Sequence, residues 1–324
     1  MREQFTYAVA RIRAKEISLL SEQDINRLMA CKTYAECLNA LRDKGWGTEI
    51  PANEDNYQAL LAAEETKLWQ LVGELVPDKN LFNVLLLPVD FHNLKAAIKG
   101  YITRSLSDGL FLAGGTVEKE HLLKCVEESH FDELPTYMST AARLAFEKLL
   151  HTGDGQLCDN ILDNALLQAI QSEGSASKSE LIRTYSEFFV ASSNIKVALR
   201  SYLLGKNLEF LKSLLVKCNS LDVEKLAIAS LNGVESMCEY LEFTNYADAV
   251  PFVRESLQKF EFWRDNKIIE LIRSERTNSF SISPIFAYIL ARQNEIKVVR
   301  IILSGKAHQI DTNLINERLR MMYA

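Results

Sequence analysis

The stretch Asn194-Ile-Lys-Val-Ala-Leu-Arg-Ser-Tyr-Leu-Leu-Gly-Lys206 has two relatives elsewhere in the chain. The first is Asn93-Leu-Lys-Ala-Ala-Ile-Lys-Gly-Tyr101, and the last is Glu295-Ile-Lys-Val-Val-Arg-Ile-Ile-Leu-Ser-Gly-Lys306. The aligned lysines stand 101 residues apart: Lys95, Lys196 and Lys297. Because two equal gaps carry similar sequence, they predict an internal repeat, and a repeat decides how the rest of the chain is interpreted.

The apolar residues of the repeat follow the period of an α-helix. In the first two copies they stand at i, i+4 and i+7, which places them on one helix face: Leu94, Ile98 and Tyr101, then Ile195, Leu199 and Tyr202. The pairs Gly205-Lys206 and Gly305-Lys306 predict helix ends, because glycine tolerates the left-handed conformation found there.

Basic residues flank this apolar stripe. We consider five of them as candidate contacts for another protein: Lys95, Lys99, Lys196, Arg200 and Lys297. Two other interpretations stay open. In the simpler one, these residues are solvent-exposed flanks or form intramolecular ion pairs. In the other, they bind phosphate. Arg300 in the third copy stands one place earlier than Arg200 predicts, so the equivalent role is not carried over to it.

Composition favours an all-α chain. Among 324 residues there are 13 Gly and 6 Pro, below the averages of about 7% and 5%. Alternating apolar runs are scarce, and no Asn-Gly or Asp-Gly turn joins two of them. Ser21 and Asp24 match a helix-starting capping box.

The repeat predicts three similar helical units of about 100 residues. Their bounds are expected at residues 1–112, 113–215 and 216–324. The last segment resembles the one at Leu20–Leu28, so residues 307–324 are expected to pack against the first unit. If the end of the chain packs near its beginning in this way, the three units would close into a ring-like or funnel-like body.

Charge and hydropathy exclude several classes of function. The net charge of −6 argues against nonspecific binding to nucleic acid or anionic membranes. Pro88 interrupts the apolar run Val84–Leu87, so no membrane span is expected. Residues 1–7 lack the order of a signal peptide, and six cysteines without a CxxC motif fit reduced thiols. We therefore expect a cytosolic protein.

Motifs for catalysis or cofactor binding are missing. There is no phosphate-binding GxxxxGK[ST], no GxGxxG, no HExxH and no GxSxG. His121 and Cys125 have helical i, i+4 spacing and could ligate a metal, but two ligands are too few, so we predict no metal site. Glu64-Glu65 is interpreted as a solvated helix face, and Trp46, Trp69 and Trp263 as core. The residues alone favour a structural or coupling protein without cofactor or catalytic residues.

An ordered set of segments resembles the C-subunit family of V/A-type ATPases, whose eukaryotic counterpart is the d subunit. The segments are Tyr7-Ala-Val-Ala-Arg-Ile-Arg13 with Leu19-Leu-Ser21, Asp90-Phe-His-Asn-Leu-Lys95, Asn194-Ile-Lys-Val-Ala-Leu-Arg200, and Phe286-Ala-Tyr-Ile-Leu-Ala-Arg-Gln-Asn-Glu-Ile-Lys297. No segment is decisive alone, but the ordered set spans nearly the whole chain.

The resemblance implies a funnel of three helical domains on the cytoplasmic side of a membrane. It implies that the protein sits on the membrane rotor ring of proteolipid subunits, receives the central-stalk subunits D and F, and passes torque without binding nucleotide. The family has no catalytic motif to carry over. Whether the complex moves H⁺ or Na⁺ and whether it makes or hydrolyses ATP stay open.

Three other functions are alternatives. A helical-repeat scaffold unrelated to rotary ATPases would use the same repeat to bind other proteins. An enzyme could hold an active site without a known motif in a cavity between domains. A nucleic-acid-binding protein is disfavoured by the acidic balance and would show salt-sensitive retention on DNA.

Overall fold

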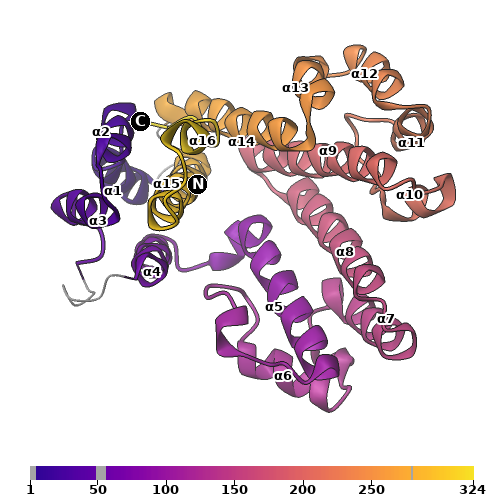
Figure 1. Ribbon diagram of the computed structural model, residues 1–324. Coiled ribbons are helices and arrows are strands. Elements are labelled where there is room, and N and C mark those ends of the chain that lie inside the picture. The colour runs from indigo at the N-terminus through magenta and orange to yellow at the C-terminus, as the bar shows by residue number, and fades with distance from the viewer. Residues whose placement is uncertain (1–4, 49–55, 279) are drawn as a thin grey trace. The chain divides into compact units, whose positions relative to one another are not determined.

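The computed structural model describes residues 5–48, 56–278 and 280–324, and the secondary structure in these ranges is helical throughout, without a strand (Figure 1). The all-α prediction is therefore confirmed. The α-helices are α1 Thr6–Glu16, α2 Glu22–Ala30, α3 Tyr34–Asp43, α4 Tyr57–Leu75, α5 Asn83–Thr103, α6 Lys119–Glu127, α7 Thr136–Thr152, α8 Gly155–Ala176, α9 Glu180–Leu203, α10 Leu208–Leu214, α11 Val223–Leu231, α12 Val234–Glu242, α13 Val250–Glu255, α14 Leu257–Arg273, α15 Ser283–Ala307 and α16 Thr312–Asn316. The short 3-10 helices are η1 Lys79–Phe82, η2 Asp108–Leu110, η3 Phe131–Glu133, η4 Ala247–Ala249 and η5 Ser274–Thr277.

Contacts between residues group the chain into two compact units. One unit combines Met1–Lys79 with Phe262–Ala324, and the other is Asn80–Glu261. The first joins the two ends of the sequence, and its boundaries fall within η1 and α14. The three units expected from the repeat, with bounds near 112 and 215, stay a prediction.

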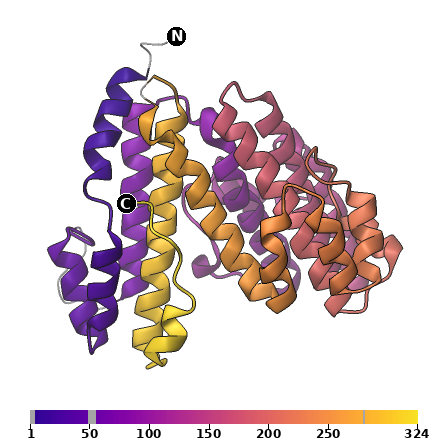
Figure 2. The same cartoon turned by 90° about the horizontal axis from the view of Figure 1, so that it is seen from above.

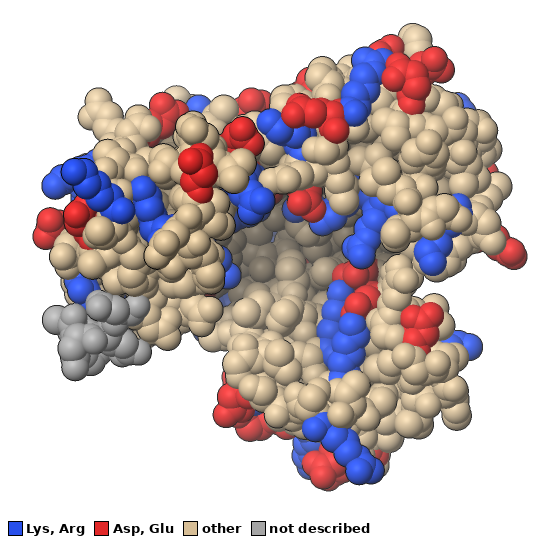
Figure 3. Space-filling view, in the orientation of Figure 1, with Lys and Arg blue, Asp and Glu red and all other residues tan. Residues whose placement is uncertain are grey.

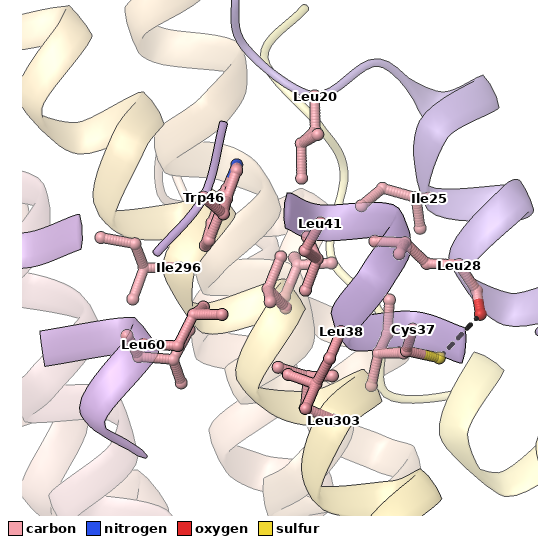
Figure 4. Close-up of a cluster of buried hydrophobic side chains, with 14 of the residues drawn as sticks. Leu20, Ile25, Leu28, Cys37, Leu38, Leu41, Trp46, Leu60, Ile296 and Leu303 are labelled. Carbon is pink, nitrogen blue, oxygen red and sulfur yellow. Dashed lines mark hydrogen bonds between the residues drawn. The ribbon is translucent and has the colours of Figure 1, made fainter. Parts of the chain in front are cut away.

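The first unit has a core built from both ends of the chain. Figure 4 shows Leu38 and Leu41 of α3 near Leu303 of α15. Ile315 and Met322 from the C-terminal segment belong to the same buried cluster. Figure 2 shows α1 beside α15, which are in contact. Burying such side chains is the main favourable term in folding, at about 1.5–3 kcal/mol for each large apolar group.

Polar contacts also attach the end of α15 to the N-terminal helices. The Lys306 Nζ atom donates to the carbonyl oxygens of Met29 and Cys31 at 2.9 and 2.7 Å. These carbonyls lie at the C-terminal end of α2, where a helix leaves carbonyl groups unpaired. The C-terminal segment therefore completes the first unit rather than extending away from it.

Ser21 starts α2 as the sequence predicts. Its hydroxyl oxygen accepts from the Asp24 N–H at 3.3 Å, and the Asp24 carboxylate accepts from the Ser21 N–H at 3.0 Å. The reciprocal capping box is confirmed.

The two predicted glycine helix ends have different outcomes. Gly205 follows α9 with a φ of +61°, so it ends the helix as expected. Gly305 lies inside α15, which continues to Ala307, so that prediction was wrong. The reason is packing: a Cβ on Gly305 would stand 2.5 Å from the Ile315 Cδ1 atom. Gly305 is small because α16 packs closely against it.

Pro88 does not interrupt its helix. It lies within α5, contrary to the expectation from sequence. As a result, Lys79–Thr103 is long and apolar enough to cross a membrane by length and composition alone. In the structure 61% of its apolar window is buried within the protein, so its apolar character is used in packing.

Candidate functional site: the repeated helices

The three related stretches of sequence lie on three long helices: α5, α9 and α15. Their aligned apolar residues Leu94, Ile195 and Ile296 are all buried. Ile98 and Leu199 of the same predicted faces are buried too, whereas Tyr101 and Tyr202 are exposed, so each face is buried only in part.

A polar residue of each repeated helix holds the backbone of another segment. In α5, Asn93 Nδ2 donates to the Leu112 carbonyl oxygen at 2.8 Å, and Asn93 Oδ1 accepts from the Leu112 N–H at 2.8 Å. In α9, Asn194 makes the same pair of bonds to Val216, at 2.7 and 3.0 Å. We call these the asparagine–backbone pairs. Each pair satisfies one backbone donor and one backbone acceptor. Val216 is buried, so its groups would otherwise lack a partner, whereas Leu112 is exposed.

The third helix carries Glu295 where the other two carry asparagine. Its carboxylate accepts from the N–H of Leu20, a residue at the other end of the chain. For α5 and α9, the bonded backbone belongs to the segment that follows the helix in sequence. For α15, it belongs instead to a segment near the N-terminus. A carboxylate cannot donate to the carbonyl of that residue, so this contact is a single bond.

Acidic residues hold two further loops. Asp90 of α5 accepts from the N–H groups of Thr116 and Val117 at 2.7 and 3.1 Å. Glu187 of α9 accepts in the same way from the N–H groups of residues 219 and 220, at 2.8 and 2.7 Å. Burial raises the pKa of Asp90 in spite of these bonds, whereas for Glu187 the bonds outweigh burial and the pKa is lowered. Asp90 belongs to a segment quoted for the family resemblance, but its target was not visible in the sequence.

Four of the five candidate contact residues form ion pairs within the chain. Lys95 and Lys99 of α5 meet two aspartates of α8, with Nζ–Oδ distances of 2.5 Å to Asp163 and 2.6 Å to Asp159. Figure 3 shows blue and red side chains together where α5 and α8 lie next to each other. Lys196 of α9 reaches Glu261 at 2.5 Å.

Lys297 has a more enclosed partner. Its Nζ lies 2.5 Å from Asp265 Oδ2, which also accepts from Arg320 Nε at 2.8 Å. Burial acts to raise the pKa of Asp265, but Lys297 and Arg320 outweigh it, so the pKa lies below its ordinary value.

Arg200 differs from the four lysines. Its side chain is exposed and has no ion pair or hydrogen bond among the described residues. It lines a pocket of about 350 Å³ in the unit Asn80–Glu261, together with Lys95 and Lys206. The Lys206 ammonium lies 5.1 Å from the centre of the Phe210 ring. Asp159 and Asp163 supply the negative charge of the same pocket.

The basic residues of this pocket differ in whether they have a partner. Lys95 is already paired to Asp163, whereas Arg200 has no such partner in the described part of the chain and can meet an outside group. A guanidinium presents paired donors to a carboxylate or phosphate. The structure therefore brings Lys95 and Arg200 to one place, and their role as contacts stays a prediction.

The first unit contains a buried charge network that the sequence analysis missed. Arg292 forms ion pairs with Glu64 and Glu295, and its guanidinium lies 4.3 Å from the centre of the Trp46 ring. Glu64 also accepts from the Gly47 N–H at 2.8 Å. Glu64 is 2% exposed, so its assignment to a solvated face was wrong.

Burial and the neighbouring charges shift the pKa values of Arg292 and Glu295. Burial lowers the pKa of Arg292, but Glu295 and Glu64 outweigh that effect and the net shift is upward. For Glu295 burial dominates, and its pKa is raised. Glu64 and Arg292 are 228 residues apart, which is why no local pattern shows the pair. Of the three tryptophans, Trp46 and Trp263 are buried as predicted, and Trp69 is half-buried.

Residues 8–318 match the family of the ATP synthase (C/AC39) subunit. The chain belongs to this family. Membership covers both compact units and all three repeated helices. It therefore confirms the resemblance derived from the four quoted segments.

Three curated relatives cover nearly the whole chain. The C subunit of the V-type sodium ATPase of Enterococcus hirae is 22% identical over 96% of this chain and 97% of its own length. The C subunit of the A-type ATP synthase of Thermococcus kodakarensis is 22% identical over 97% of this chain and 89% of its own. That of Methanocaldococcus jannaschii is 24% identical over 98% of this chain and 86% of its own.

Proposed function

We propose that this chain is a non-catalytic rotor subunit of a V/A-type ATPase. In this proposal it lies on the cytoplasmic face of the membrane, seats the central stalk of subunits D and F on the ring of proteolipid subunits, and passes torque between ATP chemistry and ion movement. The observation that carries the proposal is the family match over residues 8–318, supported by relatives named as the C subunits of V-type and A-type complexes.

The internal contacts suit a part that transmits force. The asparagine–backbone pairs and the Arg292 network fix long helices to distant segments by buried polar bonds. Such bonds have defined geometry, so a helix cannot slide along its neighbour without breaking them. A rotor subunit needs this property, because torque is lost if its helices slip.

We further propose that Arg200 and the adjacent Lys95 contact the central stalk, and that Lys99, Lys196 and Lys297 are weaker candidates. Arg200 is exposed, carries no internal ion pair in the part of the chain that the structure describes, and lines a pocket. Carboxylates of the stalk would suit it as partners.

The test is a titration of the purified full chain against a purified D–F pair from the same source, followed by size-exclusion chromatography. A stable one-to-one complex is the expected result. If a folded, monomeric chain gives no complex with its own stalk, the stalk-seat proposal fails, and the alternative of a helical scaffold for other proteins gains support.

A further inference from the structure

The end of α6 turns the chain back on itself. Ser129 has a φ of +55°, and the N–H of His130 donates to the carbonyl oxygen of Cys125 at 2.9 Å. A left-handed residue with this bond is a common way to end a helix and reverse its direction. The reversal places η3, and with it Glu133, next to α6.

Three different metal-binding groups meet at this reversal. One ring nitrogen of His121, the Cys125 Sγ atom and a carboxylate oxygen of Glu133 all lie within 4.8 Å of one another. Sequence showed only the first two, because Glu133 comes from another element beyond the turn. The third ligand removes the objection that a pair is too few.

The sulfur–nitrogen distances in this group are close to the value in a tetrahedral zinc site. Typical bond lengths and a tetrahedral angle place a thiolate sulfur and an imidazole nitrogen about 3.6 Å apart. Here Cys125 Sγ lies 3.7 Å from Nε2 and 3.9 Å from Nδ1 of His121.

The hydrogen-bond partner of the His121 ring also suits a metal ligand. Its Nε2 atom lies 3.3 Å from the Glu133 carbonyl oxygen. When Nε2 carries the proton, it donates to this oxygen and leaves the Nδ1 lone pair for a metal, which is the usual outer bond of a histidine ligand. Cys125 is 1% exposed, whereas His121 is half-buried and Glu133 exposed, so solvent reaches one side of the group.

We propose that His121, Cys125 and Glu133 bind one Zn²⁺ ion, with a water molecule as the fourth ligand. Nitrogen, sulfur and oxygen donors in this combination favour Zn²⁺ over Mg²⁺ or Ca²⁺, which prefer oxygen. On binding, the Cys125 thiol gives its proton to solvent and the sulfur bonds to the metal. The ion would tie α6 to η3 across the turn at Ser129. This inference does not depend on the proposed rotor function.

The experiment uses the reduced, full-length chain and Co²⁺ as a spectroscopic probe for Zn²⁺. We expect one equivalent of Co²⁺ to give a near-ultraviolet thiolate-to-cobalt absorption band, and Zn²⁺ to remove the band by displacement. His121→Ala and Cys125→Ser should each abolish it. Glu133→Gln should keep a band but weaken the apparent affinity by more than about tenfold, because even outer-shell losses cost that much.

Two cysteine variants serve as matched controls. Cys238→Ser removes a buried thiol of the same unit, and Cys31→Ser removes a half-buried one in the other unit. Both should leave the band unchanged. His121→Ala alters a partly exposed side chain, so its folding can be verified by circular dichroism. Failure of the wild-type chain to give a band, a band that persists in His121→Ala, or loss of the band in either control would overturn the proposal.

Discussion

The side-chain amide of Asn194 pairs with the backbone of Val216 through two hydrogen bonds, one donated and one accepted. Asn194 is fully buried, and Asn93 pairs with Leu112 in the same way 101 residues earlier. The two pairs show that the sequence repeat preserves a tertiary contact in α5 and α9, since each of these helices fixes the segment that follows it.

Replacing Asn194 with Ala should strongly destabilise the protein. Both backbone groups of Val216 would lose their partner in a buried place, at about 1–3 kcal/mol for each unsatisfied group. Urea unfolding followed by circular dichroism measures the loss. Asn232→Ala, at an exposed position after α11, should change the free energy of unfolding by less than about 0.5 kcal/mol. Equal effects of the two variants would show that the asparagine–backbone pair contributes nothing.

Replacing Arg292 with Met should cost about 3–5 kcal/mol, because it leaves Glu295 buried without a cation. Glu64 loses one of its two cations and keeps Lys67, whose Nζ lies 2.9 Å from Glu64 Oε1. Lys259→Met is the comparison, since it removes a solvent-accessible pair between Lys259 of α14 and Glu255 at the end of α13, worth roughly 0.2–1 kcal/mol. Thermal and urea unfolding of both variants test this. A loss below about 1 kcal/mol for the Arg292 variant would mean that water or rearrangement compensates the two carboxylates.

The stability contributed by Asp265 should depend on pH. Its folded-state pKa lies below the ordinary value of 3.8, so ionisation favours the folded state. That contribution is fully present above the unfolded pKa and is lost as pH falls through the folded pKa. Asp265→Asn should therefore be less stable than wild type at pH 7, and the difference should shrink below about pH 4.

Glu239→Gln provides the control for this pH series, because Glu239 is exposed on α12. Its free energy of unfolding should stay close to wild type at pH 7. A stability difference for the Asp265 variant that persisted undiminished at pH 2 would contradict the assignment of the effect to this carboxylate.

Two glycine-to-alanine changes should have opposite signs. Gly305→Ala puts a methyl group 2.5 Å from the buried Ile315 side chain, so overpacking of about 1–3 kcal/mol should outweigh the gain in helix propensity. Gly73→Ala in α4 meets an ordinary 3.5 Å contact with Lys79 and should stabilise by about 0.5–1 kcal/mol. Melting temperatures decide between these outcomes. Stabilisation by both changes would mean that α16 moves away at little cost.

Charge reversal at Arg200 tests the proposed stalk contact. Arg200 has no ion pair to lose among the described residues, so Arg200→Glu should leave the melting temperature nearly unchanged. The D–F complex should weaken by at least about tenfold, or 1.4 kcal/mol, as a carboxylate replaces the guanidinium. Lys178→Glu makes the same change of charge at another exposed position of the same unit. Equal affinities for the two variants would remove Arg200 from the contact.

Local patterns predicted much of the secondary structure and the repeat. Leu94 and Ile195 are buried where the helical period places them, and Ser21 caps α2 as its spacing indicates. Failures arose where a distant segment decided the outcome. Gly305 does not end α15, because Ile315 packs on it, and Pro88 is accommodated inside α5.

By itself, the sequence determined the helical class, the threefold repeat and the family, because helix periodicity and repeated motifs are encoded in residues close together in the chain. Tertiary structure alone decided which charges far apart in the sequence form pairs. Lys95 meets Asp163 across 68 residues and Arg292 meets Glu64 across 228. It also brought Glu133 to His121 and Cys125. The energy of an ion pair or a ligand set depends on distance in space and on burial, and neither is set by separation along the sequence.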